Sequence, residues 1–411
     1  MKSLKEGSFN GKRVLVRCDF NIGMDDSGKI TDDFRIVKAL PTIKYLVKSG
    51  AVVVLMSHLE KKERVISLEA VAYRLEKLLN ESVEFLDDCV GDKVEQVVKK
   101  GHPGEIFLLE NLRFHKEEKM NDDVFAQKLA RLGDYYVNEA FSCSHRAHAS
   151  IASVPHYLPS FAGLLLEEEI SNLSRVTNDP AHPFVVVIGG SKVETKSKMI
   201  VNISKVADHI LIGSKIGEDI LIQKQQLMGR PAVKRDPAVD AIDLTSPRVH
   251  MPIDGVLALK DLSEGYSRTA AIGKMRNEED IYDIGPETIK FFVEIIREAK
   301  TIFFNGPVGL FERQEFSNGT RSLLEAISRA HNAYRVAGGG ETIEAIHKFS
   351  AEKMFNFIST GGGAMLDYLS GNVLPGVAAL ERSYHPVQAA KPLGTPAPKP
   401  TPMPVPKPEK Q

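Results

Sequence analysis

Several features are scarce in this sequence, and each absence narrows the possible classes of protein. The 411 residues include no tryptophan and only three cysteines, which lie far apart without metal-type spacing. Such cysteine usage is typical of reduced thiols in a cytosolic protein. No apolar run approaches the length of a membrane span, and the opening MKSLKEGSFNGKR has no apolar signal core. We therefore expect a cytoplasmic protein without a membrane partner.

An excess of charge of either sign is also absent. The chain has 53 basic and 54 acidic residues, for a formal net charge of −1 at pH 7. This balance gives no general attraction to nucleic acid or to an anionic membrane, and we expect no nucleic-acid partner. The length exceeds that of one ordinary hydrophobic core and predicts two domains.

Among the features that are present, residues 184–198, FVVVIGGSKVETKSK, are the most informative. The apolar run predicts a strand buried on both faces, and Gly189 and Gly190 allow a sharp turn or a close approach to a ligand. Lys192 and Lys196 are expected on one face of a helix that starts here. Free N–H groups and lysines at a helix start suit a phosphate chain, although an ordinary lysine-rich turn would look similar. The P-loop spacing is missing.

Strands and helices alternate in the first half of the chain. We predict strands at 13–17, 51–56, 106–109 and 135–137, and helices at 32–49, 68–79 and 122–132. This order indicates an α/β domain with a largely parallel sheet, in which ligands bind beyond the carboxyl ends of the strands. These ends carry many cationic and polar side chains: Arg17, Asp19, Asn21, His58, Arg113, His145, Arg146 and His148, with Arg35 close behind.

Several cations at one sheet edge suggest a small, multiply anionic ligand, because guanidinium groups match phosphate and carboxylate. Taken singly, Arg113 or Arg146 is more often a surface or ion-paired arginine, and His58 is more often a core histidine. Their occurrence at successive strand ends favours the ligand site.

The second half repeats the alternation after a charged amphipathic segment, 164–177, which we interpret as a bridging helix. Strands are predicted at 184–188, 209–212, 249–253, 301–304, 334–337 and 356–358. Glycines follow four of these strands, so backbone is expected to approach a flat or phosphorylated ligand closely. A dinucleotide fold is disfavoured, because its glycine fingerprint and acidic residue are missing.

Nine stretches together resemble the phosphoglycerate kinase family, in family order over about residues 4–382. They are RCDFN (17–21), MSHL (56–59), LLENLRF (108–114), HRAH (145–148), GGSKV (189–193), DIGPET (283–288), NGPVGLFE (305–312), STGGGA (359–364) and LPGV (374–377). The resemblance implies an α/β protein with two Rossmann-like domains, whose mainly parallel sheets face a cleft and are joined by a helix. The expected divisions are a phosphoglycerate-binding domain at 1–165, a connecting helix and linker at 166–182 and a nucleotide-binding domain at 183–369, with 370–385 packing back near the first domain.

The same resemblance implies reversible phosphoryl transfer between 1,3-bisphosphoglycerate and ADP, giving 3-phosphoglycerate and ATP, by a monomer that uses Mg²⁺ with the nucleotide. Arg35 and Lys192 would clamp the transferred group when the domains close, and no general base is required. The implied substrate site comprises Asp19, Phe20, Asn21, Arg35, His58, Leu59, Lys61, Arg113 and Arg146. The implied nucleotide site comprises Gly189, Lys192, Lys196, Gly213, Asn305, Glu312, Gly338, Gly339, Gly340, Glu341 and Thr342, with Glu312 on the ribose and Glu341 facing the metal.

Several positions depart from the family pattern near the expected cleft. Glu60-Lys61-Lys62 stands where the family has Gly-Arg-Pro, Glu139 and Glu341 replace aspartates, 142–144 is Ser-Cys-Ser, and 212–215 lacks a triple glycine. These changes leave an alternative function, a weakened pseudo-enzyme that binds nucleotide as a regulatory or scaffold protein.

Residues 386–411 are rich in proline, as in APKPTPMPVPKP, and favour an extended, disordered tail that builds no core. Docking of this tail into an aromatic groove of a partner is the alternative.

Overall fold

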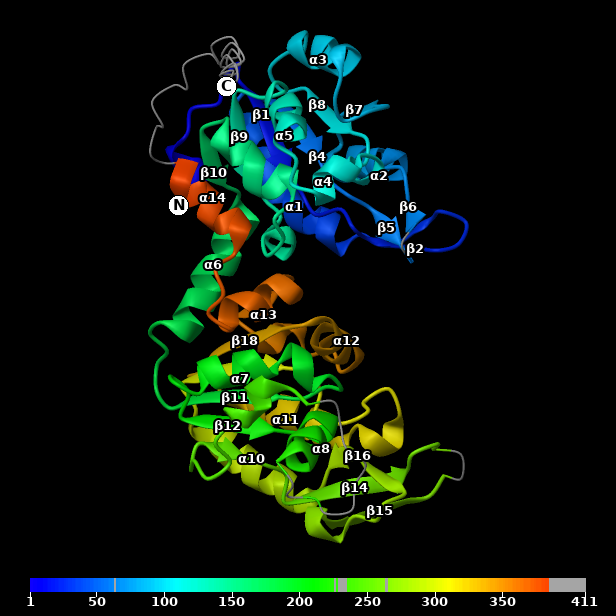
Figure 1. The fold of residues 1–411 in the computed structure, drawn as a ribbon, viewed down its shortest axis with the longest axis vertical. Coiled ribbons are helices and arrows are strands. Elements are labelled where there is room, and N and C mark those ends of the chain that lie inside the picture. The colour runs from blue at the N-terminus through cyan, green and yellow to red at the C-terminus, as the bar shows by residue number, and fades with distance from the viewer. Residues whose placement is uncertain (63, 225–226, 228–234, 263–264, 384–411) are drawn as a thin grey trace, which may run out of the picture.

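The structure is a computed structural model, and it describes residues 1–383 except 63, 225–226, 228–234 and 263–264. The predicted tail at 386–411 lies outside the described residues. Figure 1 shows an elongated molecule with two lobes, and helix α6 (Leu164–Thr177) runs between them along one side. The predicted α/β class with two mainly parallel sheets is confirmed.

The first sheet has the strand order β10-β9-β1-β4-β8-β7, and all its neighbouring strands are parallel. Its strands are β1 (Arg13–Arg17), β4 (Val52–Met56), β7 (Val83–Leu86), β8 (Ile106–Leu109), β9 (Tyr135–Asn138) and β10 (Ser160–Ala162). Helices of this part are α1 (Phe34–Lys48), α2 (Glu69–Leu79), α3 (Asp92–Lys99), α4 (Lys116–Lys119) and α5 (Asp123–Ala130). Two short antiparallel pairs, β2 (Gly23–Met24) with β3 (Ile30–Asp32) and β5 (Glu60–Lys61) with β6 (Arg64–Val65), lie in loops.

The second sheet has the order β13-β12-β11-β17-β18-β19 and is also parallel. Its strands are β11 (Phe184–Ile188), β12 (His209–Ile212), β13 (Val249–His250), β17 (Thr301–Asn305), β18 (Tyr334–Gly338) and β19 (Phe357–Ser359). The helices around it are α7 (Ser197–Ile203), α8 (Ser214–Gln223), α9 (Pro237–Asp240), α10 (Pro286–Glu298), α11 (Asn318–Arg329), α12 (Gly340–Lys348) and α13 (Gly363–Leu369). Every residue of β11 is buried, as the uninterrupted apolar run predicts. Burial of one such Val or Ile side chain contributes about 1.5–3 kcal/mol.

A third, antiparallel sheet of order β15-β14-β16 was not predicted from the sequence. It consists of β14 (Asp254–Leu259), β15 (Ser267–Ala271) and β16 (Glu279–Ile284). Residues of β15 alternate between exposed and half-buried, so its sequence SRTAA carries no apolar run that would predict a strand. The strand predicted at 249–253 is accordingly shorter, because the chain leaves the parallel sheet after His250 and enters β14.

Helix α14 (Pro375–Ser383) returns to the first lobe and lies near β10 (Figure 1). The backbone N–H of Gly376 donates to the oxygen of Ser144 over 2.9 Å. Among the helices of the described ranges, none is long and apolar enough to cross a bilayer.

Candidate active site

Asp19 and Arg35 form the centre of the first group of polar side chains. Asp19 follows β1, Arg35 lies in the first turn of α1, and Arg35 Nη1 lies 2.7 Å from Asp19 Oδ2. Arg35 also donates to the backbone oxygen of Asn21 over 3.1 Å, and the Ser142 hydroxyl donates to Asp19. Burial alone would raise the pKa of Asp19, but the charge of Arg35 and the hydrogen bonds from Ser142 and the Asn21 N–H lower it overall, so the carboxyl stays ionised.

Arg17 was counted among the cations available to a ligand, and this expectation is wrong. Its side chain is fully buried, and Nε donates to Ser150 Oγ over 2.9 Å. Ser150 Oγ in turn donates to the buried Glu118 over 2.6 Å. Arg17 is therefore part of the interior of the lobe, where it links β1 to the segment around residue 150.

His58 and His148 are neutral rather than cationic. Burial and the charge of Arg17 lower the pKa of His58 to about 3 and that of His148 to about 4. His58 Nδ1 lies 3.3 Å from Arg17 Nη2, and since an arginine only donates, the neutral ring carries its proton on Nε2. His58 thus offers a neutral N–H donor at the carboxyl end of β4.

Arg113 follows β8 and has a side chain that is only 3% exposed. Its Nη1 lies 3.8 Å from Glu60 Oε1, while Lys119 Nζ lies 2.7 Å from the same oxygen. Within the described chain, Arg113 Nε and His148 Nδ1 are buried without a hydrogen-bond partner. A buried unpaired donor is costly, so the Arg113 guanidinium is suited to an anionic ligand.

The other residues predicted for the substrate have mixed surroundings. Arg146 is exposed and its Nε lies 3.3 Å from His145 Nε2, whereas Lys61 pairs with Asp26 at 2.7 Å. The side chains of Phe20 and Leu59 are fully buried, so only their backbone can reach a ligand.

Gly189 and Gly190 end β11 as predicted, but the lysines after them differ from the expectation. Residues 193–195 form a short 3₁₀ helix, and α7 begins only at Ser197, so Lys192 and Lys196 precede separate helices. They do not share a helix face: Lys192 is exposed, and Lys196 is buried. The prediction of two stacked ammonium groups is therefore wrong.

Lys196 holds the carboxyl ends of two neighbouring strands. Its Nζ donates to the backbone oxygens of Gly189 over 2.6 Å and Asn305 over 3.0 Å. Burial lowers the pKa of Lys196 to about 8, although the nearby Glu341 opposes this shift. The Asn305 amide donates to Gly338 over 2.6 Å, and the Thr342 hydroxyl accepts from Gly306 N–H over 2.8 Å.

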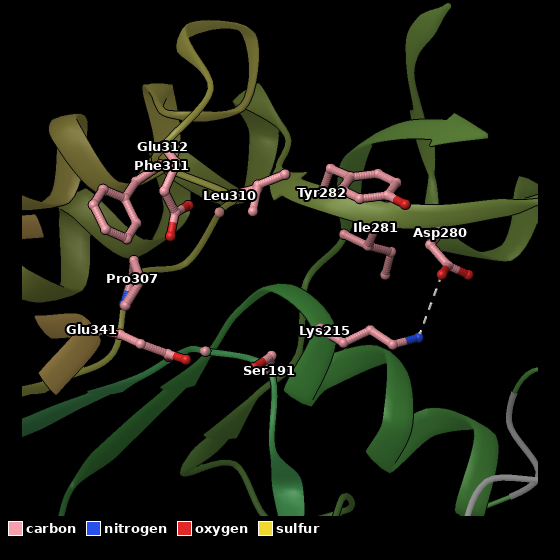
Figure 2. A pocket seen from close by; sticks show the side chains of 12 residues that line it. Ser191, Lys215, Asp280, Ile281, Tyr282, Pro307, Leu310, Phe311, Glu312 and Glu341 are labelled. Atoms are coloured by element: carbon pink, nitrogen blue, oxygen red, sulfur yellow. Dashed lines mark ion pairs between the residues drawn. The ribbon is translucent and has the colours of Figure 1, made fainter. Parts of the chain in front are cut away.

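A cavity of about 240 Å³ lies beside these glycine turns. Figure 2 shows Glu341 on one side of it and Lys215 and Asp280 on the other, with Ser191 and Leu310 between and Tyr282 near Asp280. Of the predicted nucleotide residues, only Glu312 and Glu341 line the cavity. Gly213 lies outside its wall and packs against Val308, where a Cβ would come within 2.7 Å.

Sequence reasoning missed several residues of the cavity wall. Pro307, Leu310 and Phe311 lie inside the quoted motif 305–312, which could have suggested them. Asp280, Ile281 and Tyr282 lie on β16 of the unpredicted antiparallel sheet, and no local signal in the sequence places them here.

Glu341 meets the requirements for a magnesium ligand. It is an exposed carboxylate in the first turn of α12, and a Cβ on Gly190 would lie 2.7 Å from its Oε2. Magnesium prefers carboxylate and phosphate oxygens and keeps several waters. A carboxylate facing the glycine turn therefore fits an ion that accompanies a phosphate chain.

Comparisons with known proteins agree with this arrangement. The family model described as phosphoglycerate kinase matches residues 4–372. The phosphoglycerate kinase of Dictyoglomus turgidum is 42% identical over 387 residues, covering 92% of this chain and 98% of that protein. That of Moorella thermoacetica is 41% identical over 388 residues, with the same coverage.

Solved structures give the same result. The phosphoglycerate kinase from Coxiella burnetii superposes with a TM-score of 0.81 at 35% identity, covering 92% of this chain and 98% of that one. The phosphoglycerate kinase from Pyrococcus horikoshii superposes with a TM-score of 0.80 at 33% identity, covering 93% of this chain and 99% of that one. Nothing in these comparisons favours the pseudo-enzyme alternative. The chain belongs to the phosphoglycerate kinase family and is a kinase that transfers phosphate to the carboxyl group of 3-phosphoglycerate.

Proposed function

We propose that the two groups of side chains divide the reaction between them, with 3-phosphoglycerate or 1,3-bisphosphoglycerate held by the first lobe and ADP or ATP by the second. The observation that carries this assignment is the buried, unpaired Nε of Arg113 in the first lobe, because such a donor favours an anionic acceptor. Arg35, Arg146 and neutral His58 supply further donors around it. In the second lobe, the cavity with Glu312 and Glu341 takes the nucleotide.

Asp19 and Asn21 orient this substrate site rather than react. Asp19 holds the Arg35 guanidinium at 2.7 Å, and the Asn21 side chain accepts from Glu60 N–H over 3.0 Å. Because Arg35 is 39% exposed, it can exchange this contact for the transferred phosphoryl group when the lobes close. Lys61 serves the substrate as a single point charge, whereas an arginine at this position would form a bidentate contact.

The exposed Lys192 approaches the same phosphoryl group from the nucleotide side. Phosphoryl transfer requires little covalent chemistry from the protein beyond positioning and charge stabilisation, so two cations from opposite sides suffice and no general base is needed. Lys196, Gly189, Asn305, Thr342 and Gly338–Gly340 shape the turns behind the phosphate chain.

Glu341 would hold the Mg²⁺ that accompanies the nucleotide, and the ion would neutralise phosphate charge there. Glu312, on the cavity wall, accepts from the ribose hydroxyls.

The functional units are residues 1–165 and 183–369, connected by 166–182. The segment 370–385 packs back near the first unit, and its last two residues lie outside the described residues. This division is supported because each parallel sheet takes its strands from one unit only. The protein works as a monomer. It works in the cytoplasm, where its three buried thiols, which form no disulfide, would stay reduced.

The experiment is steady-state turnover of the purified chain with MgATP and 3-phosphoglycerate. We expect saturable activity that requires both substrates and magnesium. Nucleotide binding without turnover would refute the proposal and support the pseudo-enzyme.

A further inference from the structure

Three side chains of the first lobe form a group that the assignments above do not use. Asp88, Cys89 and His115 each place one potential metal-ligand atom within 4.8 Å of the other two. Asp88 and Cys89 follow β7, and His115 follows the short 3₁₀ helix Leu112–Phe114 beyond the end of β8. Because β7 and β8 are parallel neighbours at one edge of the sheet (Figure 1), the segments after them meet there.

The geometry of this group is held by its own contacts. His115 Nε2 lies 2.8 Å from Asp88 Oδ1, and the same oxygen accepts from the backbone N–H of Cys89 over 2.6 Å. The imidazole ring stacks on the buried Phe125 of α5, with ring centroids 5.2 Å apart. Since a carboxylate only accepts, the bond to Asp88 places a proton on Nε2. A metal ion that takes the place of this proton leaves the ring as the other neutral tautomer, with its proton on Nδ1.

The ligand atoms select the class of metal ion. Zn²⁺ and Co²⁺ accept a thiolate sulfur, an imidazole nitrogen and a carboxylate oxygen together, whereas Mg²⁺ prefers oxygen alone. Zinc bonds of about 2.0–2.3 Å allow two ligand atoms to lie up to roughly 4.5 Å apart, so small rotations of these side chains suffice. The side chains of Asp88 and His115 are 49% and 29% exposed, which leaves solvent access for a water as the fourth ligand.

The thiol sets the cost of binding. Cys89 is only 1% exposed, and burial raises its pKa, so the thiol is neutral in the absence of a metal. Binding therefore releases the thiol proton to water, and the bond between the metal and the thiolate has to offset this cost. Zn²⁺ and Co²⁺ form such bonds, and Mg²⁺ does not.

The described part of the chain contains one other group of this composition, Asp19, His58 and Cys143. It belongs to the substrate site, where Asp19 pairs with Arg35 at 2.7 Å and His58 lies 3.3 Å from Arg17. Two guanidinium groups repel a cation at this short range. This second group is therefore suited to an anion, and it serves as an internal control for the first.

We propose that Asp88, Cys89 and His115 bind one Zn²⁺ or a similar divalent cation, with water as the fourth ligand. The ion connects the segment after β7 to the segment that follows Arg113, and it stabilises the first lobe. The inference goes beyond the proposed function, because none of these ligands is assigned to either substrate or to Mg²⁺.

The test is a titration of the untagged full chain with Co²⁺, after treatment with a chelator, in excess Mg²⁺ and without nucleotide. A thiolate ligand gives Co²⁺ a charge-transfer band in the near ultraviolet, and four-coordinate Co²⁺ absorbs strongly in the visible. We expect one equivalent of Co²⁺ to produce both signals and Zn²⁺ to abolish them. Zn²⁺ at about 100 times its dissociation constant should raise the melting temperature by at least about 2 °C.

Cys89→Ala should abolish the charge-transfer band, and His115→Gln should weaken Co²⁺ binding at least about tenfold. The matched controls are Cys143→Ala, from the other group, and His102→Gln, at an exposed position. Both should bind Co²⁺ as wild type does. Melting temperatures without metal show that each variant is folded, and His115→Gln carries the test if Cys89→Ala does not fold.

A wild-type chain that gives no charge-transfer band would overturn the proposal and leave Asp88 and His115 as a hydrogen-bonded pair beside a core cysteine. A band that survives in Cys89→Ala, or that disappears in Cys143→Ala instead, would overturn it as well. These measurements do not involve turnover, so the steady-state assay of the proposed function is judged separately.

Discussion

The ammonium group of Lys196 donates a hydrogen bond to the backbone oxygen of Asn305 over 3.0 Å. A second bond, to Gly189 over 2.6 Å, makes this side chain the link between the carboxyl ends of β11 and β17. Loss of the proton would remove the charge that strengthens both hydrogen bonds, although the neutral amine keeps two N–H donors. The glycine turn beside the cavity is therefore sensitive to the charge of Lys196.

We expect kcat/KM for MgATP to fall as the pH rises through about 8, because burial lowers the pKa of Lys196 to about 8. The expected fall in kcat/KM does not come from a loss of folding stability caused by deprotonation of Lys196. A lysine whose pKa is lowered in the folded state adds stability as the pH rises from that value to its ordinary one. The measurement is a pH profile of kcat/KM beside a pH profile of melting temperature.

Lys196→Met should remove most activity, and the activity that remains should no longer fall as the pH rises through about 8. Lys198→Met, at an exposed position, is the control. It should retain the wild-type activity and the fall of kcat/KM at alkaline pH. A wild-type profile that stays level well above the expected pH would contradict the role of Lys196.

Arg35→Ala and Lys192→Ala should each lower kcat far more than they raise either KM. Both cations act mainly on the transition state, and loss of one such donor costs about 2.7–4 kcal/mol. Lys44→Ala, an exposed residue of α1, controls for general loss of positive charge. Wild-type kcat in either variant would show that the residue does not contact the transferred group.

Glu341→Ala and Glu341→Gln should lower kcat/KM for MgATP at least tenfold, about 1.4 kcal/mol, and should require more magnesium at fixed ATP. Glu341→Asp keeps the carboxylate and should match or exceed wild type, since magnesium tolerates little displacement of its ligands. Glu344→Gln, exposed on the same helix, should change neither quantity. The metal assignment fails if Glu341→Ala equals wild type in both kcat/KM for MgATP and the magnesium requirement.

Glu169 of α6 should make stability depend on pH near neutrality. It accepts from Ser359 Oγ over 2.6 Å and Thr360 N–H over 2.7 Å, at the end of β19. Burial raises its pKa to about 7. Because the folded-state pKa is raised, the stability that protonation adds is complete below the ordinary glutamate value and is lost as the pH rises through about 7.

Glu169→Gln keeps an acceptor for Thr360 and a neutral side chain, so its unfolding free energy should fall less between acidic and neutral pH than that of wild type. Denaturant unfolding at several pH values measures this difference. Glu168→Gln, exposed on the same helix, should retain the wild-type slope. Identical slopes in Glu169→Gln and wild type would show that Glu169 does not titrate in this range.

Local pattern was sufficient for most parallel strands of both sheets, but β7 and β10, at the two edges of the first sheet, were not predicted. The predicted bounds of β1, β8, β11 and β12 equal those observed, because a buried strand of a parallel sheet is a continuous apolar run. The glycine turn after β11 and the arginines after the strands of the first sheet also follow from local sequence, since chain order places them at strand ends.

Local pattern failed where burial and partners depend on distant segments. Arg17 ends the buried strand β1 and Arg113 follows the buried strand β8. Arg17 is nevertheless held by Ser150, 133 residues later, whereas Arg113 Nε has no partner within the described chain. Lys192 and Lys196 also look alike in the sequence, because both closely follow β11. Only Lys196 is buried beside Asn305.

The sequence by itself determined the fold class, the two parallel sheets and the family, because these depend on periodicity and on motifs in fixed order. Only the tertiary structure decided which cations are available and which groups line the cavity together. Asp280 and Lys215 lie 65 positions apart on β16 and α8 and meet only when the antiparallel sheet packs beside the parallel one. Desolvation and charge pairing act between such neighbours in space, and spacing along the chain does not specify them.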